Sequence, residues 1–335
     1  MDPTPFQNVP QTVSTGALPG WQRVDDLVHE AHDRYSVENA GTVADYIPVL
    51  AEVDPDLFGI AVIDVAGGVH DVGDALHAFS IQSISKMFIY ALAIQEHGHA
   101  HVRDIVGVNN TGLPFNSLMA LELNGGHPMN PMVNAGAIAT TALVPGTTAS
   151  EKWDSIREGL SAFAGRQLDL DDEVYRSESD TNDRNRAMGR LLVSYGRLHD
   201  DPDDVVDIYT RQCALSVTAH DLAVMGATLA DGGVNPVTGE RVVSADVCRD
   251  TLAVVASTGL YERSGEWLFE IGLPAKSGVA GGIVAVSPGK GAAAAFSPRL
   301  DNAGNSVRAQ LAIGHLSRSL GLNLFASVPT DEESA

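Results

Sequence analysis

The stretch FSIQSISKMF, residues 79–88, places a Ser-x-x-Lys motif where an apolar helix is predicted to begin. We expect this helix to span residues 83–97. Three residues along a helix correspond to about 300° of rotation and about 4.5 Å of rise, so Lys86 would lie beside Ser83. A serine hydroxyl is a weak nucleophile until a base accepts its proton, and burial lowers a lysine pKa toward the neutral amine that such a base must be. The motif therefore predicts Ser83 as a nucleophile and Lys86 as its base.

The same motif also arises by chance, as a capping serine followed by a surface lysine. Here Lys86 is followed by the apolar run 87–90, where a lysine needs a partner or a chemical role. Ser80 and Ser85 are the competing nucleophiles. Ser80 is not one helical turn before Lys86, and Ser85 is adjacent to the lysine in sequence and so would face away from it. Ser83 is the preferred candidate.

A second motif, Lys276-Ser277-Gly278, lies about 190 residues further along the chain and precedes a predicted strand. Small residues let a strand edge approach a substrate closely. Ser-x-x-Lys followed by Lys-Ser/Thr-Gly is the order found in penicilloyl-serine transferases and serine β-lactamases. The middle element of that set, Ser-x-Asn or Tyr-x-Asn, has no convincing counterpart here.

Six blocks of the sequence together resemble the serine-dependent glutaminase family, in family order, over roughly residues 20–325. They are FSIQSISKMF (79–88), NPMVNAGAI (130–138), SESDTNDRNRAMG (177–189), YTRQCALSVTAHDLAVMGATLADGG (209–233), GLYERSG (259–265) and GLPAKSGVAGGI (272–283). The resemblance implies hydrolysis of L-glutamine to L-glutamate and ammonia. Small mismatches at residues 179–184 and at Ala280 touch no proposed catalytic atom.

The resemblance also implies which residues carry the chemistry. Ser83 matches the nucleophile, Lys86 its base, and Tyr261 a tyrosine that relays protons near the leaving group. Val279 matches the residue whose backbone N–H completes the oxyanion hole with that of Ser83. Amide hydrolysis needs these parts, because the tetrahedral oxyanion requires donors and the departing ammonia requires an acid.

Five further residues match residues of the family site. Asn134, Glu178 and Asn185 match the residues that grip this head, Tyr209 matches a second active-site tyrosine, and Gln82 precedes the nucleophile as in the family. A carboxylate suits the substrate ammonium, and amide donors suit its carboxylate. Taken singly, each of these residues is as well explained by a cap, a solvated loop or the core.

The pattern of apolar residues predicts an α/β fold of the β-lactamase and penicillin-binding-protein type. A mostly antiparallel sheet is built from both chain ends and flanked by helices, and the middle of the chain is a helical subdomain. Strands are expected at 57–65, 69–72, 282–286, 292–296 and 310–315, although residues 307–322 fit a helix nearly as well. Helices are expected at 20–36, 83–97, 117–123, 133–143, 153–164, 184–195, 205–212, 219–230 and 244–256.

The expected organisation is one domain with two tails. Residues 1–19 are predicted to be a mobile arm, 20–325 the single domain, and 326–335 an acidic tail. Within the domain, the sheet part covers about 20–85 and 257–325, and the helical part about 86–256. The acidic runs 169–173 and 200–204 are expected to be solvated loops, since neither has the spacing of a calcium-binding loop.

Composition limits the partners. The formal net charge is −22, which argues against nucleic acid or an anionic membrane surface as the main partner. Cys213 and Cys248 are expected to be buried thiols, and no cofactor or metal is expected. His97, His99 and His101 alternate after a helix end, but their spacing fits no closed tetrahedral site.

No signal peptide or membrane span is expected, so the predicted location is the cytoplasm. A homodimer or homotetramer is implied by the family resemblance alone. Two other functions stay open: a penicillin-recognising serine hydrolase or transpeptidase, and a non-catalytic glutamine-binding domain of the same fold. The absent middle motif and signal disfavour the first, and the presence of Ser83, Lys86 and Tyr261 disfavours the second.

Overall fold

The computed structural model describes residues 8–10, 12 and 16–328. Most of the expected arm and most of the expected acidic tail lie outside these residues. Val9, which falls within the predicted arm, is 4% exposed and belongs to a hydrophobic cluster with α1 (Trp21–Tyr35) and α14 (Val307–Ser319). Arg318 of α14 donates from Nε to the Val9 carbonyl at 3.0 Å.

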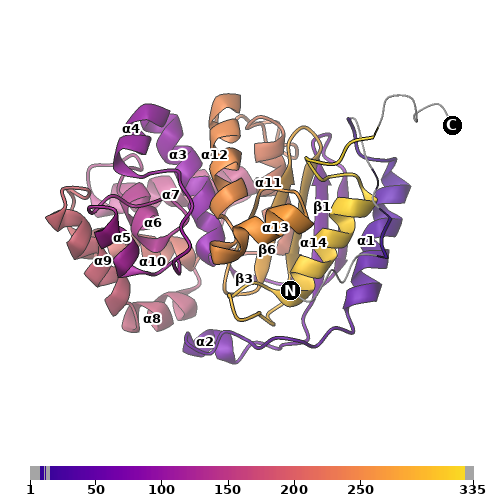
Figure 1. The fold of residues 1–335 in the computed structure, drawn as a ribbon, viewed down its shortest axis with the longest axis horizontal. Helices are drawn as coiled ribbons and strands as arrows, with labels where there is room; N and C mark the ends of the chain where they lie inside the picture. The colour runs from indigo at the N-terminus through magenta and orange to yellow at the C-terminus, as the bar shows by residue number, and fades with distance from the viewer. Residues whose placement is uncertain (1–7, 11, 13–15, 329–335) are drawn as a thin grey trace.

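Five antiparallel strands form the central sheet, in the order β2-β1-β7-β6-β5 (Figure 1). Their bounds are β1 (Gly59–Asp64), β2 (Val69–Gly73), β5 (Ala275–Ser277), β6 (Gly282–Ser287) and β7 (Gly291–Phe296). The pairing of β1 with β7, in which Ile60 lies opposite Ala295, joins the two ends of the chain. This confirms the predicted sheet assembled from both ends of the chain, in which β1 and β2 form a hairpin.

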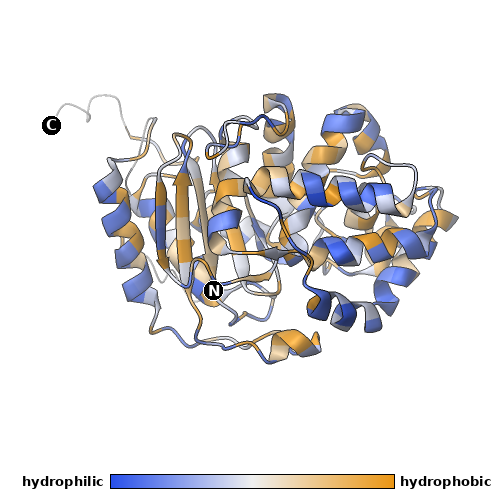
Figure 2. Ribbon diagram, turned by 180° about the vertical axis from the view of Figure 1, so that it is seen from behind, coloured by the Kyte–Doolittle hydropathy of each residue, from blue (hydrophilic) through white to orange (hydrophobic). Residues whose placement is uncertain are grey.

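Alternation along β7 explains how both faces of the sheet are covered. Ala292, Ala294 and Phe296 face one hydrophobic cluster, and Ala293 and Ala295 face another. Helix α11 (Ala219–Ala230) packs on the first face, and α1 and α14 pack on the second. Strands β1, β6 and β7 are mostly apolar, while the solvent face of α1 is polar (Figure 2). Small alanine side chains allow this close helix-on-sheet packing.

The second part of the molecule is helical and lies to one side of the sheet (Figure 1). It contains α3 (Ser85–His97), α4 (His99–Ile105), α5 (Leu118–Leu123), α6 (Asn134–Thr141), α7 (Ala149–Ala164), α8 (Asp172–Asp180), α9 (Asp183–Ser194) and α10 (Pro202–Cys213). Two further helices, α12 (Ala245–Thr258) and α13 (Ser264–Glu270), follow α11. Helix α11 falls in the range predicted for the helical part, but it covers the sheet.

The strand predicted at 310–315 is wrong, because these residues belong to α14. Every residue from Arg308 to Ser317 is buried, so the sequence there shows no alternation that separates strand from helix. Ser306 caps the helix by accepting from the Ala309 N–H, at 3.4 Å. That cap at the N-terminus favours the helix.

The acidic runs are also not simple solvated loops. Asp171 accepts hydrogen bonds from the N–H groups of Glu173 and Val174, both at 3.0 Å, and so caps α8. Asp201 caps α10 in the same way. Aspartate is favoured at these positions because its carboxylate satisfies free N–H groups and meets the positive end of the helix dipole.

Candidate active site

Ser83 lies in a tight turn, not in the first turn of an α-helix as predicted. Residues Gln82–Ile84 form a 3₁₀ turn, and α3 begins only at Ser85. Gln82 has φ of 52°, one of two non-glycine residues in the described chain with positive φ. Such a conformation costs on the order of 1–3 kcal/mol and is retained where surrounding contacts enforce it. The positive φ of Gln82 excludes this residue from the helix, so the helical backbone begins no earlier than Ser83.

The two competing serines are engaged elsewhere. Ser80 accepts a hydrogen bond from Gln82 Nε2 at 3.0 Å. Ser85 donates to the Gln82 carbonyl at 2.8 Å and accepts from Gln212 Nε2 at 2.9 Å. Of the three serines, all of which the structure describes, only Ser83 lines the large cavity that is described below.

Lys86 is completely enclosed, with 1% of its surface exposed. Its Nζ donates to Asn134 Oδ1 at 2.7 Å and to the Met132 carbonyl at 3.2 Å. Burial lowers its pKa from the usual 10.5 to about 8. A neutral amine has two hydrogens and one lone pair, so these two acceptors leave the lone pair available to accept a proton.

Tyr261 is the second non-glycine residue with positive φ, at 58°, and it begins the short turn η2 (Tyr261–Arg263). Its hydroxyl donates weakly to the Ser277 carbonyl, at 3.4 Å. Burial raises its pKa to about 12, against the opposing effect of hydrogen bonds with Ser277 and Ser83. The Tyr261 hydroxyl therefore lies beside Ser83 and keeps its proton at neutral pH.

The Lys276-Ser277-Gly278 segment packs directly against the nucleophile turn. A Cβ atom at Gly278 would come 3.1 Å from the Ile81 carbonyl oxygen, so a glycine permits this approach. Lys276 is fully buried, donates to the Ser277 carbonyl at 2.8 Å, and places its Nζ 4.3 Å from the centre of the Tyr261 ring. Burial lowers the pKa of Lys276 well below its usual value.

A cavity of about 570 Å³ opens over Ser83, between the sheet and the helical part. It brings together seven of the nine predicted site residues, from separate segments of the chain. They are Gln82, Ser83, Asn134, Glu178, Asn185, Tyr209 and Val279. Lys86 and Tyr261 are not among the described residues that line the cavity. They lie behind the lining, where Lys86 contacts Asn134 and Tyr261 contacts Ser83.

Glu178 projects from α8 into this cavity and accepts a hydrogen bond from Gln82 Nε2 at 2.5 Å. Removal from water raises its pKa from 4.5 to about 7, although the Gln82 bond opposes the rise. A carboxylate held in this way is poorly satisfied without a cation. It suits a positively charged group of a ligand.

A chain of four side chains extends from Lys86, and each accepts a hydrogen bond from the residue before it and donates one to the next group. Asn134 donates to Asn185 at 3.0 Å, Asn185 to Asn182 at 2.6 Å, and Asn182 to Thr210 Oγ1 at 2.6 Å. Thr210 then donates to the Val206 carbonyl at 2.7 Å. Each amide therefore has a fixed orientation, with its oxygen toward Lys86.

One wall of the cavity was missed by sequence reasoning. Residues 42–47, including Tyr46, and the loop 300–304 line it opposite the helical part. Burial raises the pKa of the Tyr46 hydroxyl, and both Tyr261 and Glu178 contribute to the rise. The signal that could have found it is an aromatic residue next to an acidic one, Asp45-Tyr46, in a segment to which no role was assigned.

The histidine cluster is arranged for structural contacts. His97 Nε2 hydrogen-bonds with the Leu143 carbonyl at 2.7 Å, and His99 Nδ1 pairs with Asp250 at 3.0 Å. In the described part of the chain, no group of three or more His, Cys, Asp or Glu side chains could hold a metal ion. Nor does any described helix have the length and apolar character needed to cross a membrane.

Comparison with known proteins gives consistent matches. The Glutaminase family model matches residues 41–325. Glutaminase 2 of Yersinia pestis is 54% identical over 322 residues, covering 96% of this chain and 95% of that protein. The solved structure of a probable glutaminase, ybaS, superposes with a TM-score of 0.90 at 46% identity, covering 91% and 99% of the two chains. The structure of Mglu in its glutamate form gives 0.85 at 43% identity, with 93% and 71% covered.

Proposed function

The chain belongs to the glutaminase family, and we propose that it hydrolyses L-glutamine to L-glutamate and ammonia through an acyl-enzyme on Ser83. One observation carries the mechanism: Ser83 opens into a cavity lined by the candidate head-group residues, with a buried lysine and a protonated tyrosine behind it. The solved glutamate form of Mglu supports the product side of this assignment.

In the first half-reaction, Ser83 Oγ attacks the side-chain amide carbon of glutamine while the neutral amine of Lys86 accepts the hydroxyl proton. The backbone N–H groups of Ser83 and Val279 are assigned to the oxyanion. The carbon–nitrogen bond then breaks as Tyr261 gives its hydroxyl proton to the leaving nitrogen and takes up the proton that Lys86 holds, so that ammonia departs and Lys86 is neutral again. The product of this step is a glutamyl ester on Ser83.

In the second half-reaction, water attacks the ester carbon and gives a proton to the neutral amine of Lys86. The ester bond to Ser83 Oγ breaks, the serine recovers its proton, and L-glutamate leaves. Glu178 is assigned to the substrate ammonium, and Asn134 and Asn185 to the substrate carboxylate, with Tyr209 and Gln82 completing the wall. No step of this proposal uses a metal or cofactor.

Ammonia release from L-glutamine, L-asparagine and a penicillin by the purified protein tests the proposal. We expect turnover of glutamine, with asparagine poorer because its amide is one methylene shorter and cannot reach Ser83 while its head group contacts Glu178. Stable acylation by the penicillin without glutamine turnover would assign the site to a penicillin-recognising hydrolase. Glutamine binding without turnover would make the chain a binding domain.

Replacement of Glu178 by glutamine is expected to reduce kcat/KM for L-glutamine by about ten- to a hundred-fold, since a charge-assisted hydrogen bond is worth roughly 1.5–3 kcal/mol. Steady-state kinetics measure this. Asp180→Asn, which removes an exposed carboxylate from the same helix, is the matched control and should change little. An unchanged kcat/KM in Glu178→Gln would contradict the ammonium-binding role.

The pKa of Lys86, about 8, predicts a pH dependence. The base must be neutral, so kcat/KM should fall as the pH drops below about 8, by roughly tenfold per pH unit for one proton. Glu178, whose pKa is about 7, must be ionised to bind an ammonium, so the fall should steepen below about pH 7. Profiles recorded where circular dichroism is unchanged check this. A flat profile over about pH 6–9 would exclude Lys86 as the base.

The quaternary structure and the location are both predictions, the first from the family resemblance and the second from the sequence pattern. We expect a homodimer or homotetramer acting in the cytoplasm. Light scattering coupled to gel filtration measures the first, and fractionation of the source cells the second.

A further inference from the structure

The segment 37–58, here called the strap, connects α1 to β1 and carries a wall of the cavity. In Figure 1 it leaves α1, runs along the bottom of the molecule to α2 (Pro48–Ala51) near α8, and returns to the sheet. Residues 42–47 of the strap line the cavity over Ser83. Apart from α2 the strap has little regular structure. It is held by Ala44, Ile47 and Leu50, which pack into the hydrophobic core, and by hydrogen bonds at its two ends.

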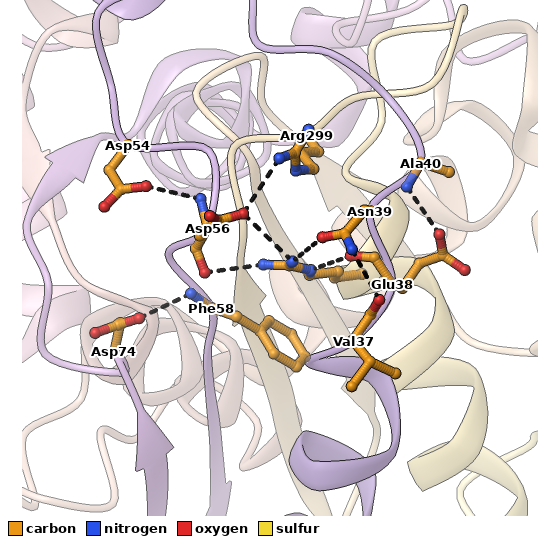
Figure 3. Close-up of polar contacts among 10 residues, drawn as sticks. Val37, Glu38, Asn39, Ala40, Asp54, Asp56, Phe58, Asp74 and Arg299 are labelled. Carbon is orange, nitrogen blue, oxygen red and sulfur yellow. Dashed lines mark hydrogen bonds and ion pairs between the residues drawn. The ribbon is translucent and has the colours of Figure 1, made fainter.

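Both ends of the strap are fastened to one buried side chain, that of Arg308 on α14. Its Nε donates to the Glu38 carbonyl at 2.6 Å and its Nη2 to Asn39 Oδ1 at 3.1 Å, at the start of the strap. Its Nη1 donates to the Asp56 carbonyl at 2.9 Å, at the end. Arg308 is 2% exposed. Figure 3 shows Glu38, Asn39 and Asp56 converging on this point.

Neighbouring contacts reinforce the same junction. Arg299 donates to the Asp56 carboxylate at 3.2 Å (Figure 3). Thr42 and Leu300 exchange backbone hydrogen bonds at 3.1 and 2.8 Å, which join the strap to the loop 300–304, the other part of the missed wall. Gly41 permits this bridge: its φ is +90°, and a Cβ there would lie 2.6 Å from the Leu300 carbonyl oxygen.

We infer that Arg308 is a positioning residue for substrate binding. By bonding to both ends of the strap, it holds residues 42–47 over Ser83. A guanidinium suits this task because its donors form a planar fork that can reach three acceptors at fixed angles, whereas an ammonium is a point donor. Arg308 does not line the cavity among the described residues, so it acts through the strap. The inference rests on the proposed glutaminase activity, whose substrate this wall would contact.

The test compares Arg308→Lys with Arg318→Lys. Arg318 lies on the same helix and also donates to a backbone carbonyl, but that of Val9, which is not part of the cavity. For Arg308→Lys we expect KM for L-glutamine to rise about tenfold and kcat to stay within about threefold, because the wall contributes uniform binding. Hydrogen exchange measured by mass spectrometry should quicken over residues 37–58. Arg318→Lys should show neither change.

A milder variant covers the case in which Arg308→Lys does not fold. Asn39→Ala removes one exposed partner of the guanidinium and leaves the other two, so a rise in KM of about threefold is expected. Unchanged KM in the folded variants, or an equal rise in Arg318→Lys, would overturn the inference. If the wild-type protein releases no ammonia from glutamine, the proposed function fails. The exchange measurement still reports whether Arg308 holds the strap.

Discussion

Replacement of Ser83 by alanine is expected to leave a folded protein that hydrolyses L-glutamine at less than about a thousandth of the wild-type rate. The substitution removes a single oxygen from a residue that is 9% exposed. The hydrogen bonds that join the turn Gln82–Ile84 to α3 do not use that oxygen. The backbone N–H of Ser85 donates instead to the backbone carbonyls of Gln82 and Ser83. Ammonia release and thermal unfolding, measured together, separate lost chemistry from lost structure.

The matched control is Ser85→Ala, two residues along the chain. Ser85 is buried and bonded to Gln82 and Gln212, so its loss should cost about 1 kcal/mol of stability and keep most of the activity. An electrophilic glutamine analogue should label Ser83, as located by mass spectrometry of the digested protein. A label on Ser80 or Ser85, or ordinary turnover by Ser83→Ala, would refute the assignment of the nucleophile.

Sequence reasoning reached the cavity because its residues lie in short motifs whose chemistry can be interpreted locally. Ser83 and Lys86 are separated by one helical turn, and burial of the lysine follows from its apolar neighbours. The late start of the helix was not predictable in the same way. Gln82 follows a segment that pairs with β4 (Ser216–Val217), and it packs against Gly278 after β5, and both of these elements are distant in sequence.

The missed wall has a related cause. Tyr46 lies in a segment with no periodicity, and its place over the cavity is set by Arg308, which is far along the chain. Helix α14 was partly misread as a strand because a helix buried on nearly every side loses the 3.6-residue pattern. Local patterns therefore do not determine long-range side-chain contacts or fully buried elements, whereas short chemical motifs such as Ser83 and Lys86 can be predicted from them.

Replacement of Tyr261 by phenylalanine is expected to lower kcat by about 10²- to 10⁴-fold, the usual contribution of a general acid or base. The pKa of about 12 keeps the hydroxyl protonated, and its contact with Ser83 places that proton next to the reacting centre. Lys86 alone could take the serine proton. The same amine would then also have to give a proton to the leaving nitrogen, so a second proton donor has a task of its own.

The phenylalanine substitution isolates the hydroxyl. Phenylalanine meets the positive φ of 58° at the same cost as tyrosine, and it keeps the ring that contacts Phe115 and Lys276 Nζ. The hydroxyl's weak 3.4 Å bond to Ser277 adds little stability. Tyr90→Phe, at a buried tyrosine of α3, is the control for removing a buried hydroxyl. A large loss of kcat confined to Tyr261→Phe, with unchanged thermal stability, supports proton transfer by this tyrosine. Near-normal kcat would leave Lys86 to serve both the nucleophile and the leaving group.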